Sequence, residues 1–372
     1  MTPDVVVVGA GAIGSAITYY LAKAGARVLM LDRGAVGAQA TQASAGMLIP
    51  LSEGSGPGPF TEMAIESVRL FEALNEELLE RTGMDIGYRR ASLVRVALDE
   101  LEEHELRTRR AWQDRLGIPV AWLDAASALD VEPNLDPAVR AALFYPGDHQ
   151  VNALALAQAL ARAAADLGAV VREGVPVDGL VTEGDRVVGV RTGIDIVRAD
   201  EVVIASGAWS ASWSETLRMP IPVRPIRGQI LALRTTGTPL RNVVYAHDGY
   251  LIGKPDGLTY VGATEEDVGF DASPTAAGVA RLLGVVPRLA PGLTDASFVR
   301  AWAGLRPATP DRLPIMGRPP QWQGVSLATG HFRNGILLAP VTGILIADLL
   351  RRERPRLSLD AFSPARFLVR AA

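Results

Sequence analysis

Cysteine is absent from the 372-residue chain. Disulfide bonds, thiolate metal sites, iron–sulfur clusters and cysteine nucleophiles are therefore excluded from its chemistry. Histidine is scarce as well, with four residues, and no spacing of His, Asp and Glu indicates a metal site. A chain without disulfides suits a reducing compartment, so we expect a cytoplasmic protein that holds no metal.

An excess of charge of either sign is also missing. The 37 basic and 41 acidic residues give a formal net charge of −4 at pH 7. The arginines at positions 351, 352, 354 and 356 form the main basic cluster, where a helix is expected to end and cations are favourable. We therefore expect no nucleic-acid partner.

Residues 5–22 carry no charge, and a run of that length could also be a membrane span or a signal anchor. Asp4 precedes this run, no basic residue does, and glycines at positions 9, 11 and 14 interrupt it. A nucleotide-binding unit explains these features better, so we expect no membrane partner.

Residues 4–33 are typical of a βαβ unit. Val5 to Val8 is a β-branched run that suits a buried parallel strand. Gly9, Gly11 and Gly14 follow with the spacing G-x-G-x-x-G. Their lack of side chains permits a tight turn, the approach of a pyrophosphate and close packing of helix on strand.

The helix that begins after these glycines is expected to reach Lys23, and a second strand should cover residues 27–31. Asp32 ends that strand, where a carboxylate can accept hydrogen bonds from an adenosine ribose. The N-terminus of the helix offers N–H groups to phosphates. Dinucleotide binding is the favoured interpretation, and this pattern alone allows either a nicotinamide or a flavin.

The rest of the chain continues in α/β rhythm, except that residues 220–306 read as long strands of a mostly antiparallel sheet. The small residues of 34–50 fit a loop that wraps around a ligand. We expect helices at 60–82, 100–116, 151–167, 274–286 and 340–352, strands at 92–98, 120–123, 141–145, 170–173, 201–205, 227–234, 249–254, 258–262, 297–306 and 325–328, and an antiparallel meander over 177–197.

Four motifs together indicate a family. They are GAGAIG at 9–14, VVIASGAWS at 202–210, WAGLRPATPDRLPIMG at 302–317 and GHFRNGILLAPVTG at 330–343. The sequence resembles the D-amino-acid oxidase-like FAD family over nearly the whole chain. Within it, the resemblance is greatest to the bacterial glycine oxidases of thiamine biosynthesis.

The resemblance implies an α/β (α+β overall) fold with a Rossmann-like FAD-binding domain and an inserted, mostly antiparallel substrate domain. The FAD-binding domain would comprise residues 1–85, 141–219 and 307–372, and the substrate domain residues 86–140 and 220–306. FAD would be bound non-covalently, since no cysteine can anchor it. The residues implied to contact FAD are Gly9, Gly11, Ala12, Ile13, Gly14, Asp32, Arg33, Ala45, Gly46, Met47, Leu48, Val177, Gly207, Trp209, Gly330, His331, Arg333, Asn334, Gly335, Ile336 and Leu337.

Three residues are implied to bind substrate. Arg306 ends an apolar strand, where a guanidinium can grip a carboxylate in two hydrogen bonds. Arg333 and Tyr250 match the further arginine and the tyrosine that the family uses at this pocket. Tyr245 and His247 lie where the local match to the family is less close, so their roles stay open.

The implied reaction oxidises glycine, sarcosine or a small D-amino acid to an imine that hydrolyses to glyoxylate and ammonia, while O2 accepts the electrons and forms hydrogen peroxide. Hydride would pass from the α-carbon to flavin N5 through positioning, without a catalytic acid or base. The family implies a homo-oligomer, often a tetramer, and a link to thiamine thiazole biosynthesis. Two alternatives stay open: a D-amino-acid dehydrogenase that reduces a quinone, and a dinucleotide-binding regulatory protein without turnover.

Overall fold

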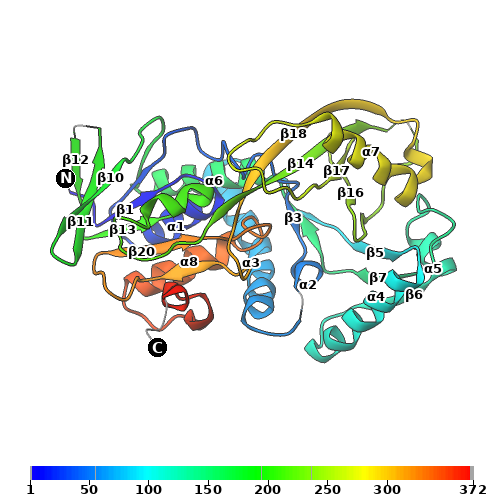
Figure 1. Ribbon diagram of the computed structural model, residues 1–372, viewed down its shortest axis with the longest axis horizontal. Coiled ribbons are helices and arrows are strands. Elements are labelled where there is room, and N and C mark those ends of the chain that lie inside the picture. Colours follow the sequence, from blue (N-terminus) through cyan, green and yellow to red (C-terminus); the bar gives the residue numbers. More distant parts are fainter. Residues whose placement is uncertain (1, 55, 194, 236, 369–372) are drawn as a thin grey trace.

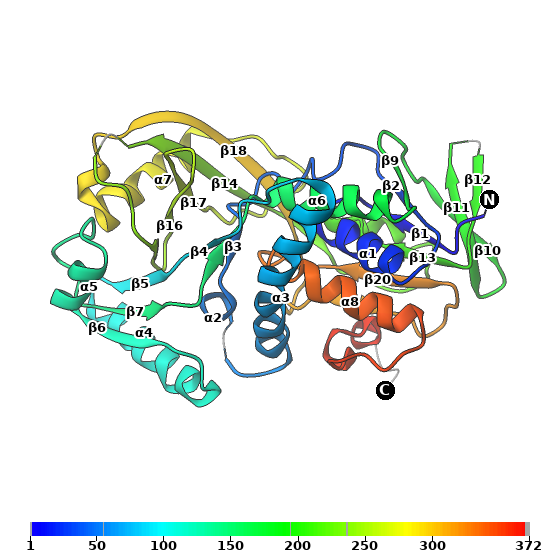
Figure 2. The same cartoon turned by 180° about the vertical axis from the view of Figure 1, so that it is seen from behind.

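The computed structural model describes residues 2–54, 56–193, 195–235 and 237–368. Two large sheets dominate it, and Figures 1 and 2 show them at opposite ends of an elongated molecule. Both termini lie at the same end, beside the sheet that contains the first strand.

The first sheet has six strands in the order β19-β20-β13-β1-β2-β9. Neighbouring strands are parallel except β19 and β20, which pair antiparallel. The strands are β1 (Val5–Val8), β2 (Val28–Leu31), β9 (Val170–Arg172), β13 (Glu201–Ile204), β19 (Ile315–Gly317) and β20 (Val325–Thr329).

The two faces of this sheet bury different layers because side chains alternate along a strand. Val5 and Val7 pack with a helical layer, whereas Val6 and Val8 pack with a three-stranded sheet that contains Val187. The helices are α1 (Ala12–Lys23), α3 (Pro59–Thr82), α6 (Ala153–Asp166) and α8 (Ala339–Leu350), and the three strands are β10 (Gly179–Glu183), β11 (Arg186–Thr192) and β12 (Asp195–Arg198).

The second sheet has eight strands in the order β18-β14-β17-β16-β15-β5-β7-β6, and only β15 and β5 pair in parallel. Helix α7 (Ala276–Leu289) packs on one of its faces. Its strands are β5 (Leu93–Ala97), β6 (Ala121–Asp124), β7 (Ala141–Tyr145), β14 (Arg224–Arg234), β15 (Val243–Tyr245), β16 (Tyr250–Gly253), β17 (Leu258–Gly262) and β18 (Ser297–Ala308).

A small sheet in the order β3-β8-β4 lies between the two large ones (Figure 2). It consists of β3 (Met47–Leu48), β4 (Arg89–Arg90) and β8 (His149–Gln150). Further α-helices of the described chain are α2 (Pro50–Glu53), α4 (Glu100–Gln113) and α5 (Ala125–Val131). The chain therefore passes between the large sheets several times.

The predicted fold class is confirmed, with a Rossmann-like parallel sheet and an inserted, mostly antiparallel sheet. The division into domains stays a prediction, and its boundary at 140/141 differs from the sheet topology. Strand β7 pairs with β5 and β6 in the eight-stranded sheet, although residues 141–145 were assigned to the FAD-binding part. An apolar strand pattern does not reveal which sheet a strand joins. Among the described residues, no helix is both long and apolar enough to cross a membrane.

Gly343 allows α8 and α1 to pack closely. A Cβ at position 343 would lie 2.5 Å from Tyr20 Cδ2 and 2.8 Å from the carbonyl oxygen of Ala16. We expect Gly343→Ala to lower the free energy of unfolding by about 1–3 kcal/mol through overpacking, although alanine is the better helix former. Chemical denaturation of the purified protein measures this change.

Gly284 in α7 is the matched control, because a Cβ there would meet nothing within 4 Å. Gly284→Ala should raise the free energy of unfolding by about 0.5–1 kcal/mol through helix propensity. If both variants changed stability in the same direction, close packing at Gly343 would not be the cause.

Candidate active site

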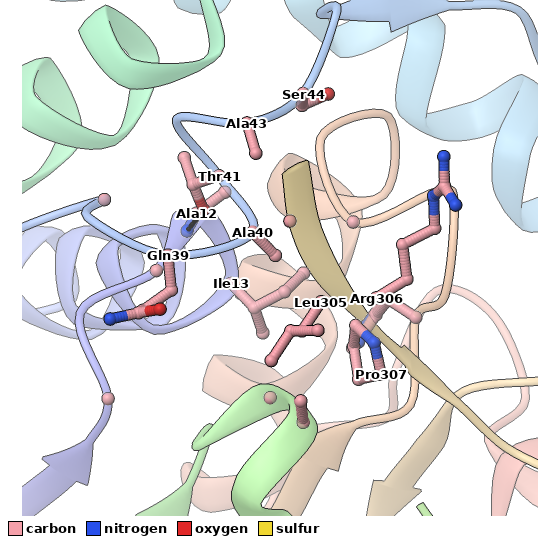
Figure 3. A pocket seen from close by; sticks show the side chains of 18 of the residues that line it. Ala12, Ile13, Gln39, Ala40, Thr41, Ala43, Ser44, Leu305, Arg306 and Pro307 are labelled. Atoms are coloured by element: carbon pink, nitrogen blue, oxygen red, sulfur yellow. Dashed lines mark hydrogen bonds between the residues drawn. The ribbon is translucent and has the colours of Figure 1, made fainter. Parts of the chain in front are cut away.

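A cavity of about 500 Å³ lies between the two large sheets. Its walls come from residues within segments 8–13, 31–49, 176–177, 205–213, 228–230, 304–307 and 328–336, together with Tyr250. Figure 3 shows one wall made by the start of α1 and the loop from Gln39 to Ser44, and another made by Leu305, Arg306 and Pro307 of β18. The cavity thus joins the nucleotide-binding motif to the antiparallel sheet.

Asp32 shapes one end of the cavity. Its carboxylate accepts hydrogen bonds from the backbone N–H of Ala10 and of Gly34, each at 2.7 Å. These bonds fix the turn after β1 and the loop after β2 against each other. Next to Asp32, the Arg33 guanidinium lies 4.0 Å from the centre of the Trp209 ring. Trp209 and Arg33 both line the cavity, and the assignment of Trp209 to the FAD site stays a prediction.

The start of α1 faces the same cavity. Gly11 is the N-cap, and the backbone N–H of Ala12 donates to Thr41 Oγ1 at 3.0 Å. Gly14 does not line the cavity. It faces the turn before α1 instead, where a Cβ would lie 1.8 Å from the carbonyl oxygen of Gly9. Its role in the structure is the close approach of helix and turn.

The loop that carries Thr41 is held from the antiparallel sheet as well. Trp302 Nε1 donates to the carbonyl oxygen of Ala43 at 3.1 Å, and Lys254 Nζ donates to that of Ala45 at 3.0 Å. Burial lowers the pKa of Lys254 to about 8. Polar contacts therefore fix the loop to the start of α1 on one side and to the antiparallel sheet on the other.

Arg306 extends from β18 into the cavity. Its Nη1 donates to the carbonyl oxygen of Thr264 at 2.9 Å. A Cβ at Gly228 on the neighbouring strand would lie 2.2 Å from three atoms of the guanidinium. The guanidinium thus packs directly on the backbone of β14. It can take this position only because residue 228 is glycine.

Arg333 and Tyr250 line the cavity beside Arg306. Arg333 Nη2 donates to the hydroxyl oxygen of Tyr245 at 2.9 Å, and the rings of Tyr245 and Tyr250 stack with centroids 6.1 Å apart. Arg333 Nη1 also lies 3.9 Å from Glu265 Oε2. Two arginines and a tyrosine therefore converge at this end.

His331 lines the cavity but is almost fully buried. Its Nε2 lies 3.1 Å from Thr342 Oγ1. Burial lowers the pKa of His331 to about 3, so the ring is neutral at neutral pH. His247, by contrast, is exposed and does not line the cavity.

Most of the residues that the sequence analysis assigned to the site come together around this one cavity. Those that do not line it are Gly14, Leu48, Gly330 and Leu337. Leu48 and Leu337 lie in the hydrophobic core, and a Cβ at Gly330 would lie 2.6 Å from Thr309 Cγ2. The lining residues are Gly9, Gly11, Ala12, Ile13, Asp32, Arg33, Ala45, Gly46, Met47, Val177, Gly207, Trp209, Tyr250, Arg306, His331, Arg333, Asn334, Gly335 and Ile336.

Sequence reasoning missed Gly228, Gly304 and Thr41, which also line the cavity. Gly228 and Gly304 face each other across β14 and β18. Glycine inside two long strands is itself a signal of close approach and could have identified this place. The contact of Thr41 with α1 has no local sequence signal because it joins distant segments.

Comparisons with known proteins agree with this geometry. The sequence pattern of the FAD dependent oxidoreductase (DAO) family matches residues 4–349. The chain belongs to this family. Its FAD cofactor and its class as an FAD-dependent oxidoreductase are thereby confirmed, as predicted.

Individual relatives match over the full chain. A glycine oxidase from Geobacillus kaustophilus is 40% identical over 367 residues, which cover 98% of this chain and 97% of that protein. A crystal structure of glycine oxidase from Geobacillus kaustophilus has a TM-score of 0.94 at 38% identity and covers 100% of both chains. The bifunctional protein ThiO/ThiG of Nostoc sp. is 38% identical over 370 residues, which are 98% of this chain but 55% of that longer protein.

The cavity fits an FAD molecule. The N-terminus of α1 and the glycines before it would offer backbone N–H groups to a pyrophosphate, and Asp32 and the cationic and aromatic side chains of Arg306, Arg333 and Tyr250 line the same cavity. Gly207 also lines the cavity, and a Cβ there would meet nothing within 4 Å. Without cysteine in the chain, no thioether can attach the flavin.

Replacing Asp32 should weaken FAD binding. Asp32→Ala removes the acceptor of two backbone N–H groups that shape the cofactor cavity. We expect a loss of about 1–3 kcal/mol in FAD binding, which raises Kd by about 5- to 150-fold. Titration of the apoprotein with FAD, followed by flavin fluorescence, measures the change.

Asp178 provides the control, because its carboxylate also accepts a backbone N–H, from Gly193, but on the outer three-stranded sheet. Asp178→Ala should leave the Kd for FAD unchanged. An unchanged Kd in Asp32→Ala would remove Asp32 from the cofactor site.

His331 should make the fold sensitive to acid. Its pKa is about 3 when folded and about 6.5 when unfolded, so between these values the unfolded chain binds the extra proton and stability falls as pH falls. We expect acidification from pH 6.5 to 4 to cost about 3 kcal/mol through this residue. Chemical denaturation at a series of pH values measures this change. The free energy of unfolding should fall more steeply with decreasing pH in the wild type than in His331→Gln.

His247→Gln removes an exposed histidine instead. In this variant the free energy of unfolding should depend on pH as it does in the wild type. Equal slopes in His331→Gln and the wild type would show that His331 titrates normally.

Proposed function

We propose that this enzyme is an FAD-dependent amino-acid oxidase of the glycine oxidase type, which oxidises glycine, sarcosine and small D-amino acids. The observation that carries the proposal is the Arg306 guanidinium, packed on Gly228 at the wall of the FAD cavity. The glycine oxidase relatives support it.

Arg306 would bind the substrate carboxylate. A guanidinium offers a planar pair of N–H donors that matches a carboxylate, and such charge-assisted bonds are strong where water is excluded. The contact with the Thr264 carbonyl oxygen holds the guanidinium in one orientation. The substrate would therefore be anchored by its carboxylate, with its amine and α-carbon directed into the cavity.

Tyr250 and Arg333 would complete the substrate end. Tyr250 is buried, and a Cβ at Gly262 would lie 2.3 Å from its hydroxyl oxygen, so the ring is held tightly against β17. Its hydroxyl would share the carboxylate with Arg306. Arg333 already donates to Tyr245 and would close the cavity beside the substrate.

Bound FAD supplies the acceptor for two electrons and a hydrogen from the amine's α-carbon. The chain's part is to hold this cofactor and to place the substrate beside it. Among the cavity-lining residues that the structure describes, the substrate end has no Asp, Glu or Lys side chain to act as a base. The amine would therefore react in its unprotonated form, without a dedicated catalytic base.

The residues proposed to hold FAD are lining residues from several segments of the chain. The start of α1 and Asp32 would bind the pyrophosphate and ribose, with Val177 on the adenine side. Residues 45–47 would lie along the flavin, and the loop 331–336 would meet its pyrimidine edge. Backbone N–H groups in such a loop stabilise the negative charge that a reduced flavin carries.

The products would be glyoxylate, ammonia and hydrogen peroxide, with O2 as the electron acceptor. The ThiO/ThiG relative supports a link of this chain to thiamine biosynthesis, in which the oxidised amine would feed formation of the thiazole. We also propose that the protein is cytoplasmic, since a chain without cysteine suits a reducing compartment. We further propose that it forms a homo-oligomer, a tetramer.

Arg306→Ala tests this function. Loss of the guanidinium leaves the substrate carboxylate desolvated without its partner, so kcat/KM for glycine should fall by about 100-fold or more. Glycolate, which offers the same carboxylate, should lose affinity in parallel. Peroxide production and flavin absorbance titrations measure the two effects, while FAD content should stay normal.

Arg351→Ala is the control, because Arg351 is half exposed and pairs with Glu353 on the surface. It should behave as wild type. Near wild-type oxidation of glycine by Arg306→Ala would rule out the proposed clamp. Oxidation of D-amino acids that requires a quinone and consumes no oxygen would favour the dehydrogenase alternative, and a flavin that no amino acid reduces would favour the protein without turnover.

A further inference from the structure

A short segment after β17 contacts both arginines of the cavity. The carbonyl oxygen of Thr264 accepts from Arg306 Nη1 at 2.9 Å. The next residue, Glu265, places Oε2 at 3.9 Å from Arg333 Nη1. Residues 264 and 265 therefore contact the two guanidinium groups at the substrate end, one residue each.

The segment is fixed from β14. The backbone N–H of Gln229 donates to Thr264 Oγ1 at 2.9 Å. Arg227 and Glu266 exchange both backbone hydrogen bonds, at 2.8 and 3.0 Å, and the buried Arg227 side chain pairs with the Glu266 carboxylate. With the residues before and after it held against β14, the Glu265 side chain is directed toward Arg333.

Glu265 also reaches a second arginine. Its Oε1 lies 2.8 Å from Nη2 of the exposed Arg312. The carboxylate thus stands between an outer arginine and the cavity-lining Arg333, and it offsets part of the positive charge of Arg333. Arg306, by contrast, donates a hydrogen bond to the carbonyl oxygen of Thr264, a neutral group.

We propose that Glu265 is a specificity-determining residue that limits the site to amines with a single carboxylate. This proposal rests on the proposed function, since Arg306 must hold the first carboxylate of the substrate. The negative charge of Glu265 offsets the positive charge of Arg333, and it repels a second substrate carboxylate that would otherwise bind to Arg333. The site therefore selects small monocarboxylate amines and rejects those with two carboxylates.

Glu265→Gln tests this selectivity with matched ligands. Glycolate and tartronate share the hydroxyl and one carboxylate and differ by the second carboxylate. In flavin absorbance titrations of the FAD-loaded protein, the variant should bind tartronate about three- to fivefold more tightly, because a like charge has been removed, and bind glycolate nearly as before. The ratio of kcat/KM for iminodiacetate to that for sarcosine should rise by a similar factor.

Asp267→Asn is the matched control, because Asp267 pairs with the exposed Arg224 in the same region and does not line the cavity. Its ligand ratios should equal those of the wild type. An unchanged tartronate-to-glycolate ratio in Glu265→Gln, or an equal rise in Asp267→Asn, would overturn the role of Glu265. A merely structural role would weaken both ligands together and would not shift the ratio.

The two proposals fail in different ways. If the wild type oxidises no amino acid, the proposed function fails, while the ligand titrations still report which carboxylates the cavity selects. If glycine is oxidised and the ratios do not move, only the role of Glu265 is lost.

Discussion

The long antiparallel pairing of β14 with β18 is the interaction on which the site depends most. It runs from Arg224 opposite Ala308 to Arg234 opposite Ser297 and carries Arg306 to the cavity. Gly228 and Gly304 face each other within it, and their missing side chains leave room for the guanidinium on one strand and for Ala43 on the other. Backbone hydrogen bonds between these strands therefore set the position of the group that would bind substrate.

Polar contacts then connect this strand pair to the cofactor half. Trp302 of β18 holds the loop at Ala43, and Thr41 in the same loop accepts from the first turn of α1. A displacement of β18 would thus reach the start of α1 as well as Arg306. The loop thereby links the two walls of one cavity.

Electrostatic balance at the substrate end comes from residues outside the cavity wall. The buried Arg227 is matched by Glu266 and Asp271, and Arg333 faces Glu265. Because charges at a partly buried site interact strongly, such partners decide how much positive charge a ligand meets. In the proposed role, Glu265 would thereby take part in the recognition of the substrate, although it does not line the cavity.

Much of the nucleotide-binding half could be predicted from the sequence. The valine run, the glycine spacing and Asp32 are local signals, because a turn without side chains and a buried parallel strand impose their own residue types. The helix from Ala153 begins after Asn152, whose side-chain oxygen accepts the backbone N–H of Ala155, a local contact that asparagine favours at this position. These features depend on neighbours in the chain, and the sequence alone determined them.

Only the tertiary structure decided the rest. Strand β7 pairs with β5 and β6 in the eight-stranded sheet, and a run such as Ala141–Tyr145 is equally apolar in either large sheet. The placement of Arg306 on Gly228, of Thr41 at α1 and of Glu265 beside Arg333 joins residues far apart in the chain. No local pattern encodes such contacts, because strand pairing and sheet packing bring their partners together only when the whole chain has folded.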